Sequence, residues 1–322
     1  MSPTPEAVAH MEARRRLALA TALATHRVWR RLDGDNLYRS WLGLLGDVLA
    51  IVVSGQLASA QMTGPWLNRM LGPENEDRPH ATRIVPEAFT GVDGAGRPLV
   101  DVLRAPIWAA LRLVTAGRPV AHALVAGQSL LDAIVQTAVA DAARAADSVG
   151  MTARPGVTGY IRVVEAGACS RCIILAGAEY QTDRAFLRHP RCKCGMEPVT
   201  REHRPQPATP SQLVAQMSEA QKRKTFGEAG AKALAEGADL GQLVNARRGM
   251  ASATVYGRRV QITTEGITKR GFAGSRLRNF QKVEGQRYRV SRTPRLMPEE
   301  IYRLADNREH AVRLLRTHGY IA

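Results

Sequence analysis

Residues 37–53 have the sequence LYRSWLGLLGDVLAIVV, in which apolar side chains recur at intervals of three or four residues. That spacing places them on one face of an α-helix. Apolar residues three to five apart from Leu17 to Val28 form a similar pattern, and Asp33-Gly34-Asp35 between the two stretches is typical of a turn. Residues 5–62 are therefore predicted to form helices.

The helical pattern returns after a stretch rich in Gly, Pro, Asp and Arg, residues 72–98, which we predict to be a loop or an exposed crossover. It covers residues 100–116 and 120–146, and Gly117-Arg118-Pro119 separates these two stretches. Aromatic residues make up only 5% of the chain, so the core should consist mainly of Ala, Leu and Val. We predict an α-helical domain at residues 1–150.

A change of pattern follows this domain. Residues 159–164 alternate in the manner of a β-strand and lead into Cys169, and the two prolines of residues 203–209 are typical of a linker. Residues 151–200 should therefore form a small separate α+β module. The predicted fold class is mainly α, with a helical N-terminal half, this module and a basic C-terminal arm at residues 201–322.

The arm is predicted to combine helices with extended chain. Residues 251–297 have no helical period and few aliphatic side chains, so we expect them to be extended or disordered until they bind a partner. The predicted helices of the arm are residues 210–226, 230–236 and 242–250, one starting at Pro298, and 308–317.

Positive charge is concentrated in this arm. The 322 residues carry 45 Lys and Arg against 29 Asp and Glu, a net charge of +16. Residues 201–322 hold 23 of the bases and 11 of the acids, which is 23 − 11 = +12 of the excess. Such a segment favours a polyanionic partner: nucleic acid, an acidic protein surface or an anionic membrane. The candidate contact residues are Arg258, Arg259, Lys269, Arg270, Arg276, Arg278, Lys282, Arg287 and Arg289.

All four cysteines of the chain fall within the 26 residues from Cys169 to Cys194. The pattern is Cys169-x2-Cys172, sixteen residues, and then His189-x2-Cys192-x-Cys194. Structural zinc sites use four thiolate or imidazole ligands, and a Cys-x2-Cys pair brings two sulfurs to one ion. Since no secretory signal opens the chain, we expect a reducing compartment, in which thiolate ligands are favoured over disulfides.

Five residues compete for the four zinc positions. The first choice is Cys169, Cys172, Cys192 and Cys194, with His189 as an alternate ligand or a neighbour of the ligands. The rival set replaces Cys194 by His189, because residues two apart point to opposite faces of a strand and bind one ion together only in a tight turn.

Pro190 and Gly195 are compatible with a tight turn around Cys192 and Cys194. A catalytic zinc would require an open coordination position and a nearby general base. The nearest acids, Glu165 and Glu179, do not form a helical His-Glu pair with the ligands, so a structural zinc is predicted.

Membrane binding and nucleotide binding have less support in the sequence than a structural zinc site. The most apolar window, residues 41–53, is about 13 residues long and contains Asp47, short of the ~20 residues that span a bilayer. We therefore expect no membrane partner. No phosphate-binding loop or dinucleotide fingerprint is present.

A serine protease would need a serine within hydrogen-bonding reach of a histidine. Ser129 and His122 share a helix face but are separated by about 10 Å, which is too far. His80 could approach a serine from the predicted loop. A protease is therefore kept as the alternative function.

Residues 169–177 (CSRCIILAG) and 186–194 (FLRHPRCKC) resemble the C-terminal module of the Mu F-like minor head proteins of tailed phages. In that family a Cys-x2-Cys pair, a glycine and a closing His-Pro-x-Cys-x-Cys recur in the same order. Further segments are similar to the version found in actinobacterial phages: residues 221–227 (QKRKTFG), 245–250 (NARRGM), 264–271 (TEGITKRG) and 314–320 (LLRTHGY).

The resemblance implies a minor capsid protein that acts in head morphogenesis. It implies a virion location inside the capsid near the portal, after assembly in the host cytoplasm. The implied partners are the portal protein and the scaffold or major capsid protein, with packaged DNA as a further partner of the basic arm. Some members of the family are, or are fused to, a capsid maturation protease, which is the enzyme that the alternative function implies.

Overall fold

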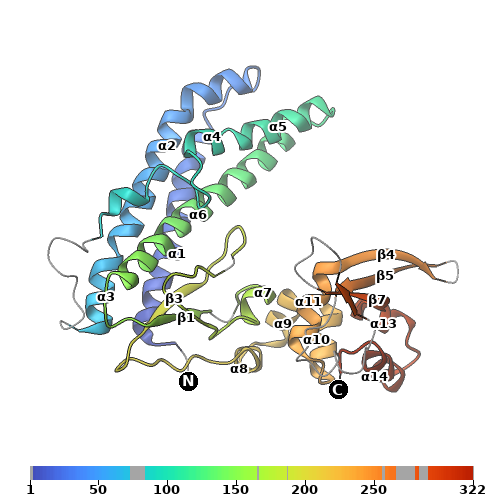
Figure 1. Ribbon diagram of the computed structural model, residues 1–322. Helices are drawn as coiled ribbons and strands as arrows, with labels where there is room; N and C mark the ends of the chain where they lie inside the picture. Colours follow the sequence, from blue (N-terminus) through green and yellow to red (C-terminus); the bar gives the residue numbers. More distant parts are fainter. Residues whose placement is uncertain are drawn as a thin grey trace. The chain divides into compact units, whose positions relative to one another are not determined.

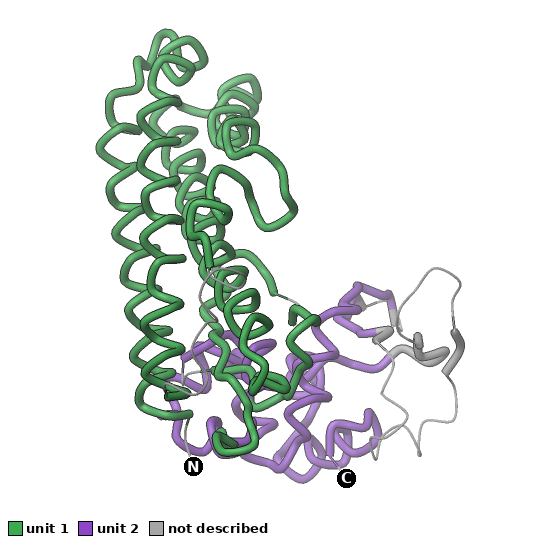
Figure 2. Tube along the Cα trace, turned by 60° about the vertical axis from the view of Figure 1, so that its left-hand side comes forward, with its two compact units in different colours: residues 1–164, 177–207 green, residues 165–176, 208–322 purple. Residues whose placement is uncertain are grey.

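The computed structural model describes residues 3–72, 84–164, 167–186, 188–255, 258–265, 280–282 and 289–321. Contacts within the chain divide it into two compact units, coloured separately in Figure 2. Unit 1 comprises residues Met1–Val164 and Gly177–Pro207. Unit 2 comprises residues Glu165–Ala176 and Ala208–Ala322.

Long helices form most of unit 1 (Figure 1). Helices α1, α2 and α6 pack against one another, and α5 packs against α6. The turn predicted at residues 33–35 separates α1 from α2, so the helices predicted over residues 5–62 are confirmed. The helices of unit 1 are α1 (Pro5–Trp29), α2 (Leu37–Gln61), α3 (Thr63–Leu71), η2 (Pro86–Phe89), α4 (Leu99–Val102), α5 (Ala105–Thr115) and α6 (Val120–Thr152).

The helical core of unit 1 forms around two tryptophans. Trp41 is fully buried and donates its indole N–H to the carbonyl oxygen of Leu103 at 3.0 Å, and its ring meets Trp29 edge-on. Gly127 on α6 allows this close packing, because a Cβ there would lie 2.7 Å from the Trp29 ring and 2.9 Å from the Pro106 carbonyl oxygen. The core therefore depends on large rings from α1 and α2 that pack against small residues of α6.

Two predicted helix boundaries in unit 1 differ from the structure. The single helix predicted over residues 100–116 is α4 followed by α5, because Pro106 in the first turn of α5 has no N–H to continue a helix through it. Helix α6 continues to Thr152, beyond the predicted end at residue 146. In the predicted loop, residues 84–98 contain η2 and a bridge between Val92 and Pro98, and residues 73–83 lie outside the described residues.

A three-stranded antiparallel sheet completes unit 1. Its strands β1 (Gly159–Val163), β2 (Glu179–Tyr180) and β3 (Gly195–Val199) lie in the order β2-β1-β3. Arg162 of β1 pairs in register with Met196 of β3, directly after Cys194 and Gly195. The strand predicted over residues 159–164 is therefore confirmed, and the sheet holds the end of the cysteine-rich segment.

Unit 2 combines short helices with a second antiparallel sheet, whose strand order is β4-β5-β7-β6. Its core contains Leu243, Met297, Ile301, Leu315 and Tyr320. The elements of unit 2 are α7 (Ser170–Ile173), α8 (Pro210–Ala215), α9 (Glu219–Phe226), α10 (Glu228–Ala235), α11 (Leu240–Ala246), η3 (Arg247–Gly249), β4 (Met250–Val255), β5 (Arg258–Glu265), β6 (Phe280–Lys282), β7 (Arg289–Leu296), α13 (Pro298–Leu304) and α14 (Arg308–Thr317).

Helices lie at the predicted positions in unit 2, but two of the predicted bounds are wrong and the sheet was not predicted. The helix predicted over residues 242–250 is α11 followed by η3, and Met250 already belongs to β4. The helix predicted over residues 210–226 is two helices, because Ser218 caps α9 in a capping box with Gln221 and starts a new helix there. Residues 251–297 were expected to be extended or disordered, and their described part forms the four strands. Residues 266–279 and 283–288 lie outside the described residues.

Two helical stretches, residues 37–71 and 120–152, are long and apolar enough to cross a membrane, with mean hydropathies of 1.7 and 1.4. Core helices of globular proteins often meet the same length and composition criteria. In unit 1, both stretches contribute residues to the helical core.

Candidate metal centre

The first half of the candidate metal centre is a single helical turn. Cys169 is the residue before α7, and Cys172 lies within α7. The backbone N–H of Cys172 donates to the carbonyl oxygen of Cys169 at 2.9 Å, which closes the turn. The Cys-x2-Cys spacing thus places both thiols on one turn, as the sequence predicts for paired zinc ligands.

The second half is the tight turn from His189 to Cys192. The backbone N–H of Cys192 donates to the His189 carbonyl oxygen at 3.0 Å, Pro190 occupies the second position, and Arg191 has a φ of 60°. Proline followed by a residue of positive φ is the pattern of a type II turn. The turn ends at Cys192 and does not include Cys194, whose sulfur nevertheless lies within 4.8 Å of the Cys192 sulfur.

Helix α6 holds this turn in place from outside. The Arg191 backbone N–H donates to the hydroxyl of Thr137 at 3.0 Å, and the Arg191 guanidinium donates to the carbonyl oxygen of Ser129 at 2.8 Å. Arg191 is the one non-glycine residue with positive φ in the described part of the chain. Its two bonds to α6 compensate for the strain of that backbone conformation.

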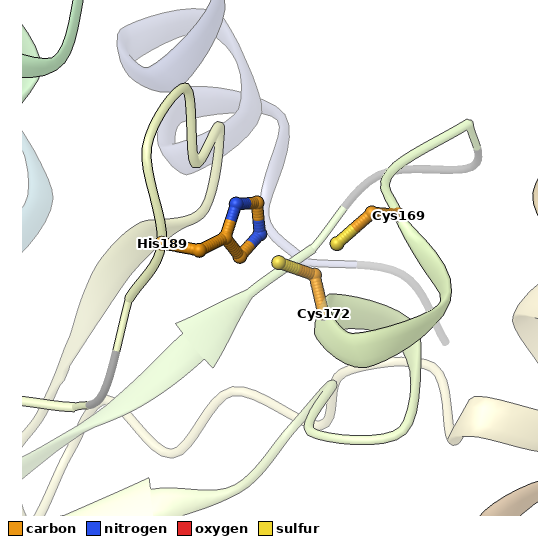
Figure 3. Close-up of side chains that lie close together, drawn as sticks. All are labelled: Cys169, Cys172 and His189. Atoms are coloured by element: carbon orange, nitrogen blue, oxygen red, sulfur yellow. The ribbon is translucent and has the colours of Figure 1, made fainter. Parts of the chain in front are cut away.

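The structure brings all five predicted ligands into one cluster. The ligand atoms of Cys169, Cys172 and His189 lie within 4.8 Å of one another, and Figure 3 shows these three side chains facing a common point. The sulfurs of Cys172, Cys192 and Cys194 form a second group and also lie within 4.8 Å of one another. Cys172 belongs to both groups and is therefore the residue on which any ligand set in this cluster depends.

The chemistry of these donors fits zinc. Sulfurs about 2.3 Å from a tetrahedral ion lie about 3.8 Å apart, so ligand atoms within 4.8 Å need only small shifts to bind one. The four cysteines are present as thiols, and Cys172, Cys192 and Cys194 are buried. The cluster could therefore hold a metal ion.

Two buried arginines provide positive charge beside the sulfurs. Arg162 is 1% exposed, and its Nη2 donates to Cys194 Sγ at 3.5 Å and to Cys192 Sγ at 3.8 Å. Arg144 of α6 donates from Nη1 to the carbonyl oxygens of Cys192 and Cys194, at 3.2 and 3.3 Å. Cations near the sulfurs favour thiolates, the form that binds a metal.

Aromatic packing fixes Arg162 in this position. Its guanidinium lies 4.3 Å from the centre of the Phe186 ring, and Phe186 packs against Tyr160 and Tyr180. The Tyr160 hydroxyl donates to the carbonyl oxygen of Arg184. Burial raises the pKa of Tyr160 to about 12, so the hydroxyl keeps its proton and this bond at neutral pH. Neither arginine was predicted as part of the site. The available signals were a charged residue, Arg162, in an otherwise apolar strand and another, Arg144, in an alanine-rich helix, since a buried charge requires a partner.

The His189 ring has the hydrogen bond expected of a ligand. Its Nδ1 lies 2.8 Å from the carbonyl oxygen of Pro190. A protonated Nδ1 that donates to this oxygen leaves the Nε2 lone pair for a metal, the arrangement usual for histidine ligands. This observation favours the rival ligand set, in which His189 binds the ion.

The remaining predicted sites are only partly described. Arg259 is exposed on β5, and Arg258, Lys282 and Arg289 lie on β5, β6 and β7. Lys269, Arg270, Arg276, Arg278 and Arg287 lie outside the described residues. The binding surface predicted for the basic arm therefore stays a prediction.

The residues weighed for catalysis that the structure describes are not arranged around a nucleophile. The hydroxyl of Ser129 donates to the carbonyl oxygen of Val125 at 3.0 Å, within its own helix. His122 is exposed on the same helix, and His80 lies outside the described residues. Glu179 is exposed on β2, and Glu165 also lies outside the described residues.

Comparison with protein families gives a match over the first two thirds of the chain. A family model described as VG15 protein matches residues 1–220, which include the whole cysteine-rich segment. No curated protein and no solved structure matches the chain.

Proposed function

This chain belongs to the VG15 protein family, a family of phage gene products, and we propose that it is a minor capsid protein that acts in head morphogenesis at the portal vertex. The observation that carries the proposal is the cluster of Cys169, Cys172, His189, Cys192 and Cys194. The order of these residues along the chain resembles that of the Mu F-like minor head proteins, and the family match spans them. The family match supports a phage origin, and the order of the residues in the cluster supports a role as a head protein.

The metal in this proposal is a structural zinc ion. Cys169, Cys172 and His189 would bind it, and either Cys192 or Cys194 would supply the fourth ligand. When bound, the ion would stabilise the fold, since the binding free energy of a structural zinc adds to the free energy of folding. The residues of the chain position the ligands: α7 holds the first pair, and the turn anchored on α6 holds the others.

Metal analysis of purified protein tests the zinc site. We expect one zinc per chain in the wild type and none in Cys172→Ser, because Cys172 belongs to both ligand groups. His189→Ala should lose the metal to a chelator that the wild type resists, whereas His122→Ala, an exposed histidine on α6, should behave as the wild type. Absence of zinc from the wild type would end the metal proposal.

The fourth ligand can be assigned with two single variants. Of Cys192→Ser and Cys194→Ser, one should retain zinc at full occupancy and the other should lose it. Retention in both would mean that each can replace the other next to Arg162.

The role in the particle is tested with the phage itself. Deletion of the gene, with complementation by wild-type or Cys172→Ser protein, should give packaged heads only with the wild type, and mass spectrometry should find the protein in purified heads. Normal heads in the deletion strain would refute the assembly role. Cleavage of scaffold or capsid protein that depends on Ser129 would instead support the maturation protease.

The proposed partners are the portal protein and the scaffold or major capsid protein, with packaged DNA bound by the basic arm. Binding to DNA should weaken steeply as salt rises, because phosphate contacts release counterions. Deletion of residues 258–295 should reduce both the affinity and the slope with salt. If the salt dependence of the affinity were unchanged by the deletion, DNA would not be a partner of the basic arm.

A further inference from the structure

A pocket within unit 1 lies among α1, α6 and residues 191–196. Its volume is about 60 Å³. A single water needs about 10–15 Å³ of such space, so the pocket has room for about four waters or one small functional group. Its lining includes Met11, Arg14 and Arg15 from α1, Ala140, Ala143, Arg144 and Asp147 from α6, and Arg191, Cys192, Lys193, Cys194 and Met196.

The lining of this pocket carries an excess of positive charge. Five lining residues are cationic: Arg14, Arg15, Arg144, Arg191 and Lys193. Asp147 is the one carboxylate among the lining residues, and it already accepts hydrogen bonds from Arg14 and from the Thr63 hydroxyl. His10 also lines the pocket, and burial lowers its pKa, so its ring is neutral at pH 7.

Two of the cations are buried and keep one donor each without an acceptor. The Nη groups of Arg14 donate to Asp147, Ser59 and Thr63, and those of Arg144 donate to Asp141 and to the carbonyl oxygens of Cys192 and Cys194. Arg14 is 8% exposed and Arg144 is 9% exposed. The Nε–H of each is buried and has no hydrogen-bond partner among the described residues. Burial lowers the pKa of Arg14, and the charge of Arg144 acts in the same direction, which shows that the two guanidinium groups repel each other. Buried donors without acceptors are costly and rare in native proteins, so these two point to a group that the chain itself does not supply.

The other walls of the pocket restrict what this group can be. Met11, Ala140, Ala143 and Met196 present apolar surface. A tetrahedral inorganic ion would place some of its oxygens against that surface without hydrogen bonds. A carboxylate has two oxygens, and an aliphatic stem behind it would contact the alanine and methionine side chains.

We propose that this pocket binds a carboxylate carried on a short aliphatic stem, next to the guanidinium groups of Arg14 and Arg144. The carboxylate comes either from an acidic residue of another protein segment or from a free small molecule. Arg15 and Lys193, which are both exposed at the pocket, attract it from solvent. Cys192 and Cys194 also line the pocket, so this site adjoins the candidate metal centre. Binding of the carboxylate requires neither a bound metal ion nor the proposed role in head assembly.

Calorimetric titration of the full-length protein at constant ionic strength tests the site. The probes are glutarate, the peptide acetyl-Glu-Ala-Ala-Glu-amide and inorganic phosphate. We expect both carboxylate probes to bind at least tenfold more tightly than phosphate. Tighter binding of the peptide identifies a protein segment as the source, and equal or tighter binding of glutarate identifies a free carboxylate.

Variants at the exposed positions avoid any loss of folding that would follow from changing Arg14 or Arg144. The double variant Arg15→Gln with Lys193→Gln should weaken binding of the carboxylate probes about tenfold. The matched control, Arg39→Gln with Arg112→Gln, removes two exposed charges from the same unit outside the pocket and should leave binding unchanged. Absence of carboxylate binding, equal binding of phosphate, or an equal loss in the control would overturn the proposal.

Discussion

Acidification should destabilise unit 2 through His318. Burial lowers the pKa of His318 to about 4, and the charge of Arg295 acts in the same direction. The backbone N–H of Leu296 donates to Nδ1 of His318 at 3.4 Å, a bond that requires the neutral ring. In an unfolded chain the histidine pKa is about 6.5. Between the two pKa values the unfolded state binds more protons than the folded state, so stability is complete above about pH 6.5 and falls as pH falls towards 4.

The size of this effect follows from the two pKa values. At pH 5 the histidine of the unfolded chain is almost fully protonated, while the folded ring remains largely neutral. The free energy of unfolding of unit 2 should therefore decrease by about 2 kcal/mol between pH 7.5 and pH 5, and by about 3 kcal/mol at pH 4. His318 is partly exposed, so these values are upper limits.

Oxidation of Met297 gives a local measure of this stability. Met297 is fully buried in the core of unit 2, next in the chain to Leu296, so peroxide oxidises it only when the unit unfolds. The extent of oxidation against guanidinium concentration, read by mass spectrometry, gives the unfolding midpoint at pH 7.5 and at pH 5. Tryptophan fluorescence would not serve, because all four tryptophans lie within residues 29–108 of unit 1.

Two variants separate His318 from other titrating groups. His318→Asn keeps an acceptor for the Leu296 N–H and removes the ionisable ring. Without this titrating group, the free energy of unfolding of unit 2 should change by less than about 0.5 kcal/mol over the same pH range. His310→Gln, on the same helix with a partly exposed side chain, should keep the wild-type dependence. An equal loss of stability in wild type and His318→Asn would refute the reasoning.

Three further predictions concern packing and capping. Asp147→Asn leaves the Arg14 side chain buried without its carboxylate, so the free energy of unfolding should fall by about 3 kcal/mol. Denaturation in guanidinium chloride, followed by tryptophan fluorescence, measures this loss. A loss below about 1 kcal/mol would contradict the buried ion pair. Gly127→Ala should cost about 1–3 kcal/mol by overpacking, whereas Gly46→Ala, with nothing within 4 Å of its Cβ, should stabilise the same helical core by about 0.5–1 kcal/mol. Thr209→Ala removes the capping box of α8 and should cost about 1 kcal/mol in the peroxide assay.

The helices of unit 1 could be predicted because local patterns determine them. The apolar period around Trp41 and the Asp33-Gly34-Asp35 turn identify α1 and α2 directly. The sheet of unit 2 could not be predicted, since its strands between Met250 and Leu296 lack a clear apolar alternation and pair across sequence separations that a local pattern does not report.

The cluster of five candidate ligands could be predicted because thiols and imidazole at short spacing are the pattern of a metal site. Their surroundings were not predictable in the same way. Arg144 reaches the carbonyl oxygens of Cys192 and Cys194 from a helix about 50 residues earlier in the chain, a separation fixed only by the fold. The contact of His189 Nδ1 with the Pro190 carbonyl oxygen, which favours His189 as a ligand, is likewise visible only in the structure.

The turn at Arg191 has a consequence for how the chain would take up a metal ion. Its left-handed backbone and its two bonds to α6 do not involve a ligand atom, so His189 and Cys192 are positioned by the fold alone. The conformational entropy of this half of the site is therefore lost during folding, before any ion arrives. The turn from Cys169 to Cys172 is likewise closed by a backbone hydrogen bond that involves no ligand atom. Its ordering cost is therefore also met during folding and does not reduce the affinity for the ion.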